Sequence, residues 1–155
     1  MSGAAAVLLE PGAGRSVSLG PTRVGFKVES TDARGASLVE FEAAPGFDTG
    51  LHVHERLEEI FFVTGGEFEF HAGEDAFHAT PGACVFVPPG VPHAFANRTE
   101  EPATLLLVMS PPTHDRYFDE LASIVDGDGP HGEEIAALRE RYDTKQLSSL
   151  DAGRA

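Results

Sequence analysis

Short apolar runs separated by turn-forming residues dominate the chain between Thr22 and Ser110. β-branched and aromatic residues recur there roughly every 8–12 residues, with Gly, Pro, Asp and Asn between them, a spacing typical of an all-β sandwich or barrel. The pattern predicts strands near residues 22–29, 36–43, 50–54, 58–63, 67–71, 75–79, 83–87, 92–97 and 103–109.

Two of these runs distribute their apolar positions differently. The segment EFEFHAG (67–73) alternates polar and apolar residues, as a half-buried strand does. The segment EIFFV (59–63) is apolar almost throughout, so we expect it to be buried on both faces. Cys84 falls in a third run, and we expect it to be a small residue of the core.

The apolar period changes after Pro111 and Pro112, where the sequence predicts two short helices packed on the barrel over residues 113–143. The linker DGDGP (126–130) separates them. The first helix has one apolar face, formed by Tyr117, Phe118, Leu121, Ile124 and Val125. The second runs from about Gly132 to Tyr142, and its apolar stripe contains Ile135, Leu138 and Tyr142.

The two ends of the chain are expected to lie outside the barrel domain, which we place at residues 21–112. Residues 1–20 are rich in Ala, Gly and Ser and predict a flexible arm, with a short strand around Val7–Leu9. Residues 144–155 predict a polar tail.

Composition narrows the functional classes. A length of 155 residues is usual for one domain with one core. The net charge of −14 disfavours nucleic acid and anionic membranes as partners, because both attract basic surfaces. The absence of a long apolar run or a secretory signal predicts a cytoplasmic protein. A single cysteine excludes an intramolecular disulfide and a thiolate zinc cage.

Candidate chemistry is concentrated in HVHERLEE (52–59) and VPPGVPHAFAN (87–97). Side chains at i and i+2 of a strand point the same way, so His52 and His54 present two imidazoles to one point. A turn after His54 would bring Glu58 or Glu59 back to that point, and His93 opens a later strand. Three imidazoles and one carboxylate predict a site for one divalent metal ion. The other strand histidines, His71 and His78, are expected to be exposed and not to be ligands.

The two segments resemble the two conserved motifs of the cupins. The first cupin motif corresponds here to Gly46, His52, His54, Glu59 and Gly66, and the second to Gly82, Pro88, Gly90, His93 and Asn97. Glu58 with Gly65 fits the first motif as well. We favour Glu59 as the ligand, because it directly precedes the apolar run IFFV, as the ligand carboxylate does in cupins, and because it shares the parity of Phe61 and Val63.

The resemblance implies a double-stranded β-helix, or jelly-roll, barrel with the metal inside and metal ligands at His52, His54, Glu59 and His93. Nitrogen and oxygen donors without sulfur suit Fe, Mn, Ni, Co or Zn. The sequence looks closest to small single-domain cupins described as quercetin-dioxygenase-like. Their activity implies a dioxygenase acting on an aromatic or enolic small molecule, with Glu59 also acting as a catalytic base.

Two alternatives to a dioxygenase stay open. One is a non-redox cyclase, isomerase or lyase that uses the metal as a Lewis acid, and the other is a metal-dependent binding protein without turnover. The barrel sequence is rich in phenylalanine, which we expect to fill the core or line the mouth of the barrel: Phe61, Phe62, Phe68, Phe70, Phe77, Phe86 and Phe95. The resemblance further implies a homodimer, because many cupins of this type pair through barrel edges, and the N-terminal arm could add a strand to a neighbour.

Overall fold

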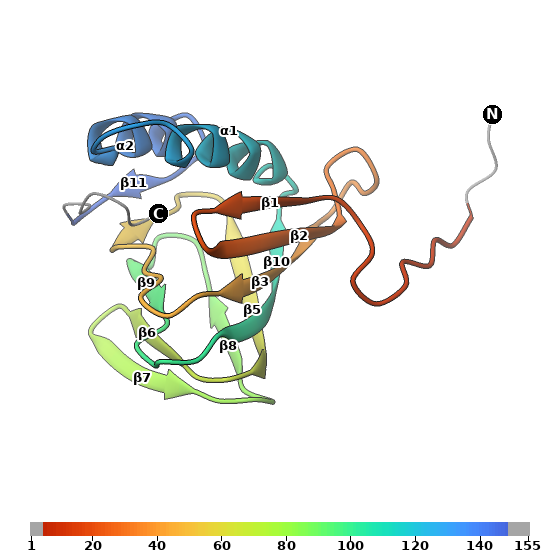
Figure 1. The fold of residues 1–155 in the computed structure, drawn as a ribbon, viewed down its shortest axis with the longest axis horizontal. Coiled ribbons are helices and arrows are strands. Elements are labelled where there is room, and N and C mark those ends of the chain that lie inside the picture. The colour runs from red at the N-terminus through yellow and green to blue at the C-terminus, as the bar shows by residue number, and fades with distance from the viewer. Residues whose placement is uncertain (1–4, 149–155) are drawn as a thin grey trace.

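The computed structural model describes residues 5–148 and contains two antiparallel sheets, with two helices over one end (Figure 1). The larger sheet has the strand order β1 (Ser16–Leu19), β2 (Thr22–Val28), β3 (Ser37–Ala43), β10 (Ala103–Ser110), β5 (Glu58–Gly65), β8 (Cys84–Val87). The smaller sheet has the order β11 (Lys145–Gln146), β4 (His52–Val53), β9 (His93–Ala96), β6 (Phe68–Ala72), β7 (Asp75–Ala79). The arrangement is a jelly roll, so the predicted fold class is confirmed.

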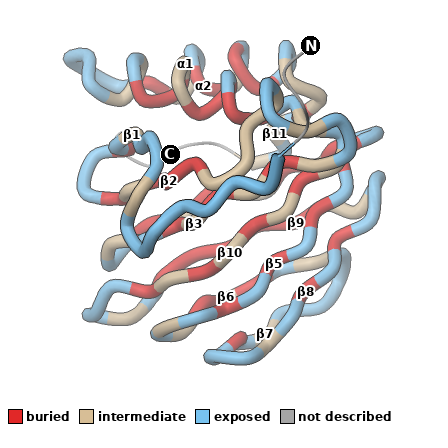
Figure 2. Tube along the Cα trace, turned by 90° about the vertical axis from the view of Figure 1, so that its right-hand side faces the viewer, coloured by how far each residue is buried: buried red, intermediate tan, exposed pale blue. Residues whose placement is uncertain are grey.

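Burial alternates along the strands, and the buried positions of both sheets meet in one core (Figure 2). On β6, Phe68 and Phe70 are buried, as the alternation predicted. The prediction for EIFFV is wrong, because Ile60 and Phe62 are exposed on the outer face of the larger sheet. The expectation for Cys84 is also wrong, since its side chain is exposed on that same outer face. Only the inner face of this sheet is covered by the second sheet, so an apolar sequence alone does not bury both faces.

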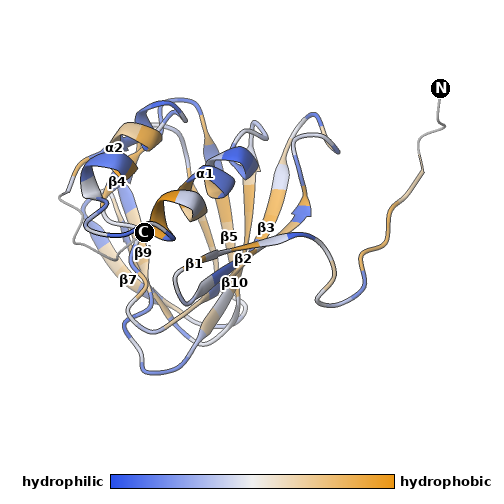
Figure 3. Ribbon diagram, turned by 45° about the horizontal axis from the view of Figure 1, so that its top comes forward, coloured by the Kyte–Doolittle hydropathy of each residue, from blue (hydrophilic) through white to orange (hydrophobic). Residues whose placement is uncertain are grey.

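The helices α1 (Asp115–Val125) and α2 (Gly132–Glu140) pack their apolar residues into the same core. Figure 3 shows hydrophobic and hydrophilic bands on both helices, as the amphipathic pattern requires. Phe118 of α1 meets Phe41 of β3 edge to face, with ring centroids 5.5 Å apart. The second helix ends two residues before the predicted Tyr142. Neither helix in the described part of the chain is long and apolar enough to cross a bilayer.

Both predicted end segments contain a strand. The expected strand at Val7–Leu9 is wrong, because that stretch has no regular structure and Val7 is 84% exposed. The first strand is instead β1, which lies inside the predicted arm and pairs with β2. Within the predicted tail, β11 pairs with β4. The last residues of the tail, 149–155, lie outside the described residues. The segment around β11 therefore belongs to the barrel, beside the strand that carries His52.

Two motif glycines occupy positions where only glycine fits the backbone well. Gly66 follows β5 with φ of 69°, and a Cβ atom there would lie 2.8 Å from Cα of Ala103. Gly90 has φ of 85°, and its N–H donates to the carbonyl oxygen of His54 at 2.7 Å. This bond joins the Pro-Pro-Gly turn before β9 to the end of β4, so it sets the two histidine-bearing strands side by side.

Candidate metal centre

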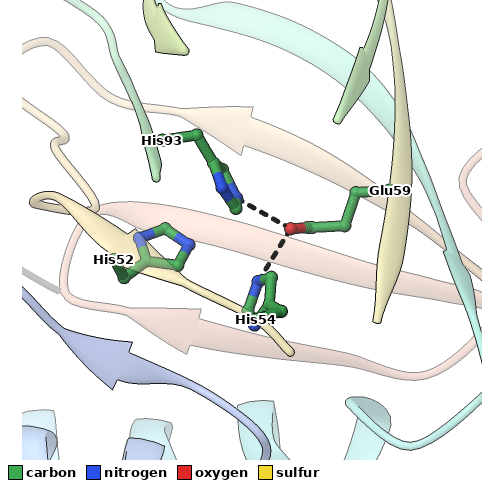
Figure 4. A group of neighbouring side chains, drawn as sticks. All are labelled: His52, His54, Glu59 and His93. Carbon is green, nitrogen blue, oxygen red and sulfur yellow. Dashed lines mark hydrogen bonds and ion pairs between the residues drawn. The ribbon is translucent and has the colours of Figure 1, made fainter. Parts of the chain in front are cut away.

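Four buried side chains from both sheets converge inside the barrel (Figure 4). His52 lies on β4 directly opposite His93 of β9, and their ring centroids are 4.3 Å apart. His54 follows β4 immediately and points to the same side as His52, as the i, i+2 spacing predicted. Glu59 reaches the three imidazoles from β5 of the opposite sheet. One potential ligand atom from each of the four lies within 4.8 Å of the others.

The structure distinguishes Glu59 from Glu58. Glu59 is 5% exposed, and its Oε1 lies 2.8 Å from Nε2 of His54 and 2.9 Å from Nε2 of His93. Glu58 is exposed on the outer face of β5. The preference for Glu59 follows from strand alternation, because Glu59 shares the inward face with Phe61 and Val63.

The outer nitrogen of each imidazole is held by the backbone. Nδ1 of His52 lies 2.9 Å from the carbonyl oxygen of Gly50, Nδ1 of His93 lies 2.9 Å from that of Val91, and Nδ1 of His54 lies 2.9 Å from that of Asp143. A carbonyl oxygen only accepts hydrogen bonds, so each Nδ1 carries the proton that it donates. Each Nε2 is thereby left as the inward-facing nitrogen, which is how metal-binding histidines are commonly oriented.

This orientation fits a metal ion at the centre. In neutral His54 and His93 the Nε2 lone pairs would face the Glu59 carboxylate at hydrogen-bonding distance, and like partial charges would repel. A positive centre among these atoms removes the repulsion, and either protons or a divalent cation can supply it. Three imidazole nitrogens and one carboxylate oxygen are a donor set that Fe, Mn, Ni, Co and Zn accept.

Burial and mutual charge shift the pKa values of the group. Burial lowers the pKa of His52 well below its usual value, and the charges of His93 and Arg139 act in the same direction. Burial by itself would raise the pKa of Glu59, but hydrogen bonds from His54 and His93 outweigh it and hold this pKa well below the usual value. Burial likewise opposes protonation of His54, yet the hydrogen bond to Glu59 raises its pKa overall. Glu59 is therefore an ionised acceptor, and His52 is neutral.

The segment between α2 and β11 contacts His54 on the Nδ1 side of its ring. The Asp143 carboxylate accepts the backbone N–H groups of Glu55, Arg56 and Leu57 at 2.9–3.0 Å, which fixes the turn between His54 and Glu59. Asp143 itself has φ of 52°, a left-handed conformation unusual outside glycine. Thr144 places its hydroxyl 3.0 Å from Nδ1 of His54. The C-terminal part of the fold thus helps to position a candidate ligand.

A pocket opens beside the four side chains, between the barrel and the helices. The cavity measures about 40 Å³, and since one water needs about 10–15 Å³ on this measure, it has room for only a few water-sized groups. Of the seven phenylalanines considered from the sequence, only Phe95 lines this pocket among the described residues. Phe61, Phe68 and Phe70 fill the core, while Phe62 and Phe86 are exposed. The remaining aromatic walls come from elsewhere in the chain: Phe41, Phe47, Tyr117 and Phe118.

Polar residues of the helical end also line the pocket, and the sequence reasoning missed them. His114 is buried with its ring 5.4 Å from that of His54, and burial, followed by the charge of His54, lowers its pKa to about 4. Arg139 of α2 is 3% exposed. The sequence did contain a signal for the burial of Arg139. Its position fits the i, i+3, i+4, i+7 spacing of the buried helical face, which comprises Ile135, Leu138, Arg139 and Tyr142. The sequence contained no such signal for His114. His71 and His78 are exposed, as expected, and do not join the site.

Comparison with known proteins agrees with this architecture. Residues 39–109 match the family model of the cupin domain. An uncharacterized protein of Methanocaldococcus jannaschii, MJ1618, is 30% identical over 76 residues, which are 49% of this chain and 61% of that protein. The chain thus covers about three fifths of the length of this relative.

Two solved structures share the fold. An uncharacterized conserved protein with a double-stranded β-helix domain from Klebsiella pneumoniae is 25% identical, with a TM-score of 0.51 over 67% of this chain and 84% of that one. KdgF from a Halomonas species has a TM-score of 0.64 at 18% identity, over 72% of this chain and 99% of that one. The two motifs seen in the sequence and the matched domain cover the same central strands.

Proposed function

We propose that this chain, which has the double-stranded β-helix fold of the cupins, is a metal-dependent enzyme that acts as a dioxygenase on a compact enolic molecule. The observation that carries the proposal is the set of four preorganised donor groups, of which His52, His54 and Glu59 line a pocket. Three imidazoles and one carboxylate would hold a divalent ion without filling the coordination of metals that accept more than four ligands. The small cavity favours a compact enolic substrate over a larger aromatic one, the other alternative from the sequence.

Each residue of the site has a role in this proposal. His52, His54 and His93 would hold the ion through Nε2, with their rings fixed by the Nδ1 hydrogen bonds. The ion, when bound, would supply Lewis acidity and, if redox-active, an electron path to dioxygen. Glu59 is ionised and buried beside the pocket, so it can accept the enol proton. Phe41, Phe47 and Phe95 exclude water from the inner wall.

Oxygen consumption tests the reaction class. Metal-free protein is loaded anaerobically with Fe(II), Mn(II), Ni(II), Co(II) or Zn(II), mixed with a panel of small enols and enediols, and then exposed to air. The proposal predicts oxygen uptake with at least one redox-active ion, loss of uptake in Glu59→Gln, and little change in Glu58→Gln. If no ion and no enol gives oxygen uptake above that of the free metal, the dioxygenase proposal is wrong.

A second candidate is a non-redox isomerase, cyclase or lyase, and the polar helical wall of the pocket favours it. Arg139 and His114 face a cavity that is too small for an extended apolar substrate. Such an enzyme needs only Lewis acidity from the ion. Turnover by the zinc-loaded protein without oxygen would support this reaction class. Tight binding of the same compounds without conversion would instead indicate a binding protein.

A further inference from the structure

The pocket contains a buried positive charge that no carboxylate of the described chain balances. Arg139 is 3% exposed, and none of the ion pairs among residues 5–148 involves it. Every other residue of the pocket is neutral or belongs to the candidate metal centre. Buried arginine is rare unless it is paired with an acid, so its presence here needs an explanation.

The hydrogen bonds of Arg139 orient its guanidinium without neutralising it. Nε donates to the hydroxyl of Tyr117 at 2.9 Å, and Nη1 donates to the side-chain oxygen of Gln146. Gln146 is fixed in turn, since its amide nitrogen donates to the backbone oxygen of Ser148 at 2.8 Å. Both acceptors of Arg139 are uncharged. The guanidinium is therefore held rigidly at the wall of the pocket, and its charge remains available to a ligand.

A metal ion in the same pocket would add to this positive charge. Among the described residues that line the pocket, Glu59 carries the only carboxylate. One divalent cation and one guanidinium against a single carboxylate leave a net charge of about +2 in a low-dielectric site. An anion entering the pocket would compensate this charge, and it would be attracted before any specific contact forms.

We propose that Arg139 is the anion-binding residue of the site and that the substrate is a compact carboxylic acid, with its carboxylate at Arg139 and a hydroxyl or enol oxygen at the metal centre. The inference rests on the proposed metal-dependent function and names its substrate class. A carboxylate is planar and small, which suits both the guanidinium fork and a cavity of about 40 Å³. Hydroxy acids and the enols of 2-oxo acids have this combination of groups.

A binding cycle with two probes and two variants tests the role of Arg139. The probes are glycolate and its neutral isostere glycolamide, titrated calorimetrically into zinc-loaded full-length protein. Charge-assisted hydrogen bonds of this kind correspond to about 10-fold to 100-fold in affinity. The preference for glycolate over glycolamide should fall by that factor in Arg139→Gln. It should be unchanged in Arg141→Gln, which removes the same charge from an exposed side chain near the end of α2. An unchanged preference in Arg139→Gln would overturn the proposal.

A second measurement covers the case in which Arg139→Gln does not fold. The Nε–H resonance of Arg139 can be followed by nitrogen-15 NMR in the unmodified protein, because the group is buried and hydrogen-bonded. Glycolate should shift this resonance more than glycolamide does. Equal shifts from both probes, or none, would contradict the role assigned to Arg139.

The two proposals fail in different ways. Metal content is measured on the same samples by elemental analysis. If the protein takes up no metal but glycolate still shifts Arg139, the metal-dependent function is wrong and the anion site stands. If metal binds and turnover occurs with neutral enols as well as with acids, the function stands and the assignment of Arg139 is wrong.

Discussion

The backbone carbonyl oxygen of Asp143 lies 2.9 Å from Nδ1 of His54, so a residue beyond α2 orients a candidate ligand at the end of β4. The Asp143 carboxylate meanwhile holds the turn that leads from His54 to Glu59. A single residue thus organises the first part of the short segment that carries two of the four donors.

Asp143→Gly should weaken metal binding by about 10-fold, a typical cost of losing a partner that orients a ligand. Glycine tolerates the left-handed backbone at this position and keeps the carbonyl group, so the change removes only the carboxylate. Competition with a metal-binding dye measures the affinity. Asp128→Gly, which removes an exposed carboxylate from the linker between the helices, is the control and should leave the affinity unchanged.

Glu59→Gln should lower metal affinity by more than about 100-fold, because it replaces a charged ligand and not merely an orienting partner. Glu58→Gln makes the identical chemical change one residue away, on the exposed face of β5. Elemental analysis after dialysis should find metal in Glu58→Gln and little in Glu59→Gln. Equal metal content in the two variants would show that Glu59 is not a ligand.

Asn97→Ala should destabilise the fold by about 3 kcal/mol, since it leaves buried backbone groups without partners. The Asn97 side chain is fully buried, donates to the carbonyl oxygens of Ala43 and Glu101, and accepts from Thr99. Thr99→Ala, which removes a single hydroxyl from the rim of this network, should cost less than about 1 kcal/mol. Urea unfolding measures both. Equal unfolding midpoints for Asn97→Ala and the parent would mean that this network adds nothing to stability.

We propose that the predicted homodimer forms through the outer face of the larger sheet. Exposed or half-exposed apolar side chains lie next to one another there, across β3, β10, β5 and β8: Leu38, Leu106, Val108, Ile60, Phe62 and Phe86. A contiguous apolar face of this kind is typical of an interaction surface.

Phe86→Asp should therefore convert the dimer to a monomer at micromolar concentration, as measured by light scattering. Phe86 is 55% exposed, so the change should cost the isolated fold little. His78→Asp, on the exposed face of the smaller sheet, should leave the mass unchanged. A parent protein that is itself monomeric would refute the prediction.

The parts of the fold that depend on local pattern could be predicted from the sequence. Strand alternation placed Glu59 inward, and the His-x-His spacing placed His52 and His54 together. The predictions that failed concern burial, because burial depends on which faces of a strand the rest of the molecule covers. Two strands have apolar sequences that predicted burial on both faces, but within the described chain no second layer covers their outer face. The exposed residues on that face include Ile60, Phe62 and Cys84.

The contacts made by the segment between α2 and β11 could not be predicted from the sequence either, for a different reason. Thr144 and Asp143 act through their positions against β4, which are set by the packing of α2 and the pairing of β11 with β4. No period or spacing in the sequence encodes that contact. Arg139 is the exception, because a charged residue at an apolar helical position was visible from the start.

The hydrogen bond between His54 and Asp143 joins residues separated by 89 positions in the chain. During synthesis on the ribosome, His52 and His54 therefore emerge long before Asp143, the residue that orients His54. Nascent protein would hold the donors in only a loose arrangement until α2 and β11 have been made and docked. Under the proposed metal-dependent function, capture of the ion at full affinity is consequently a late event in maturation, which follows the docking of α2 and β11.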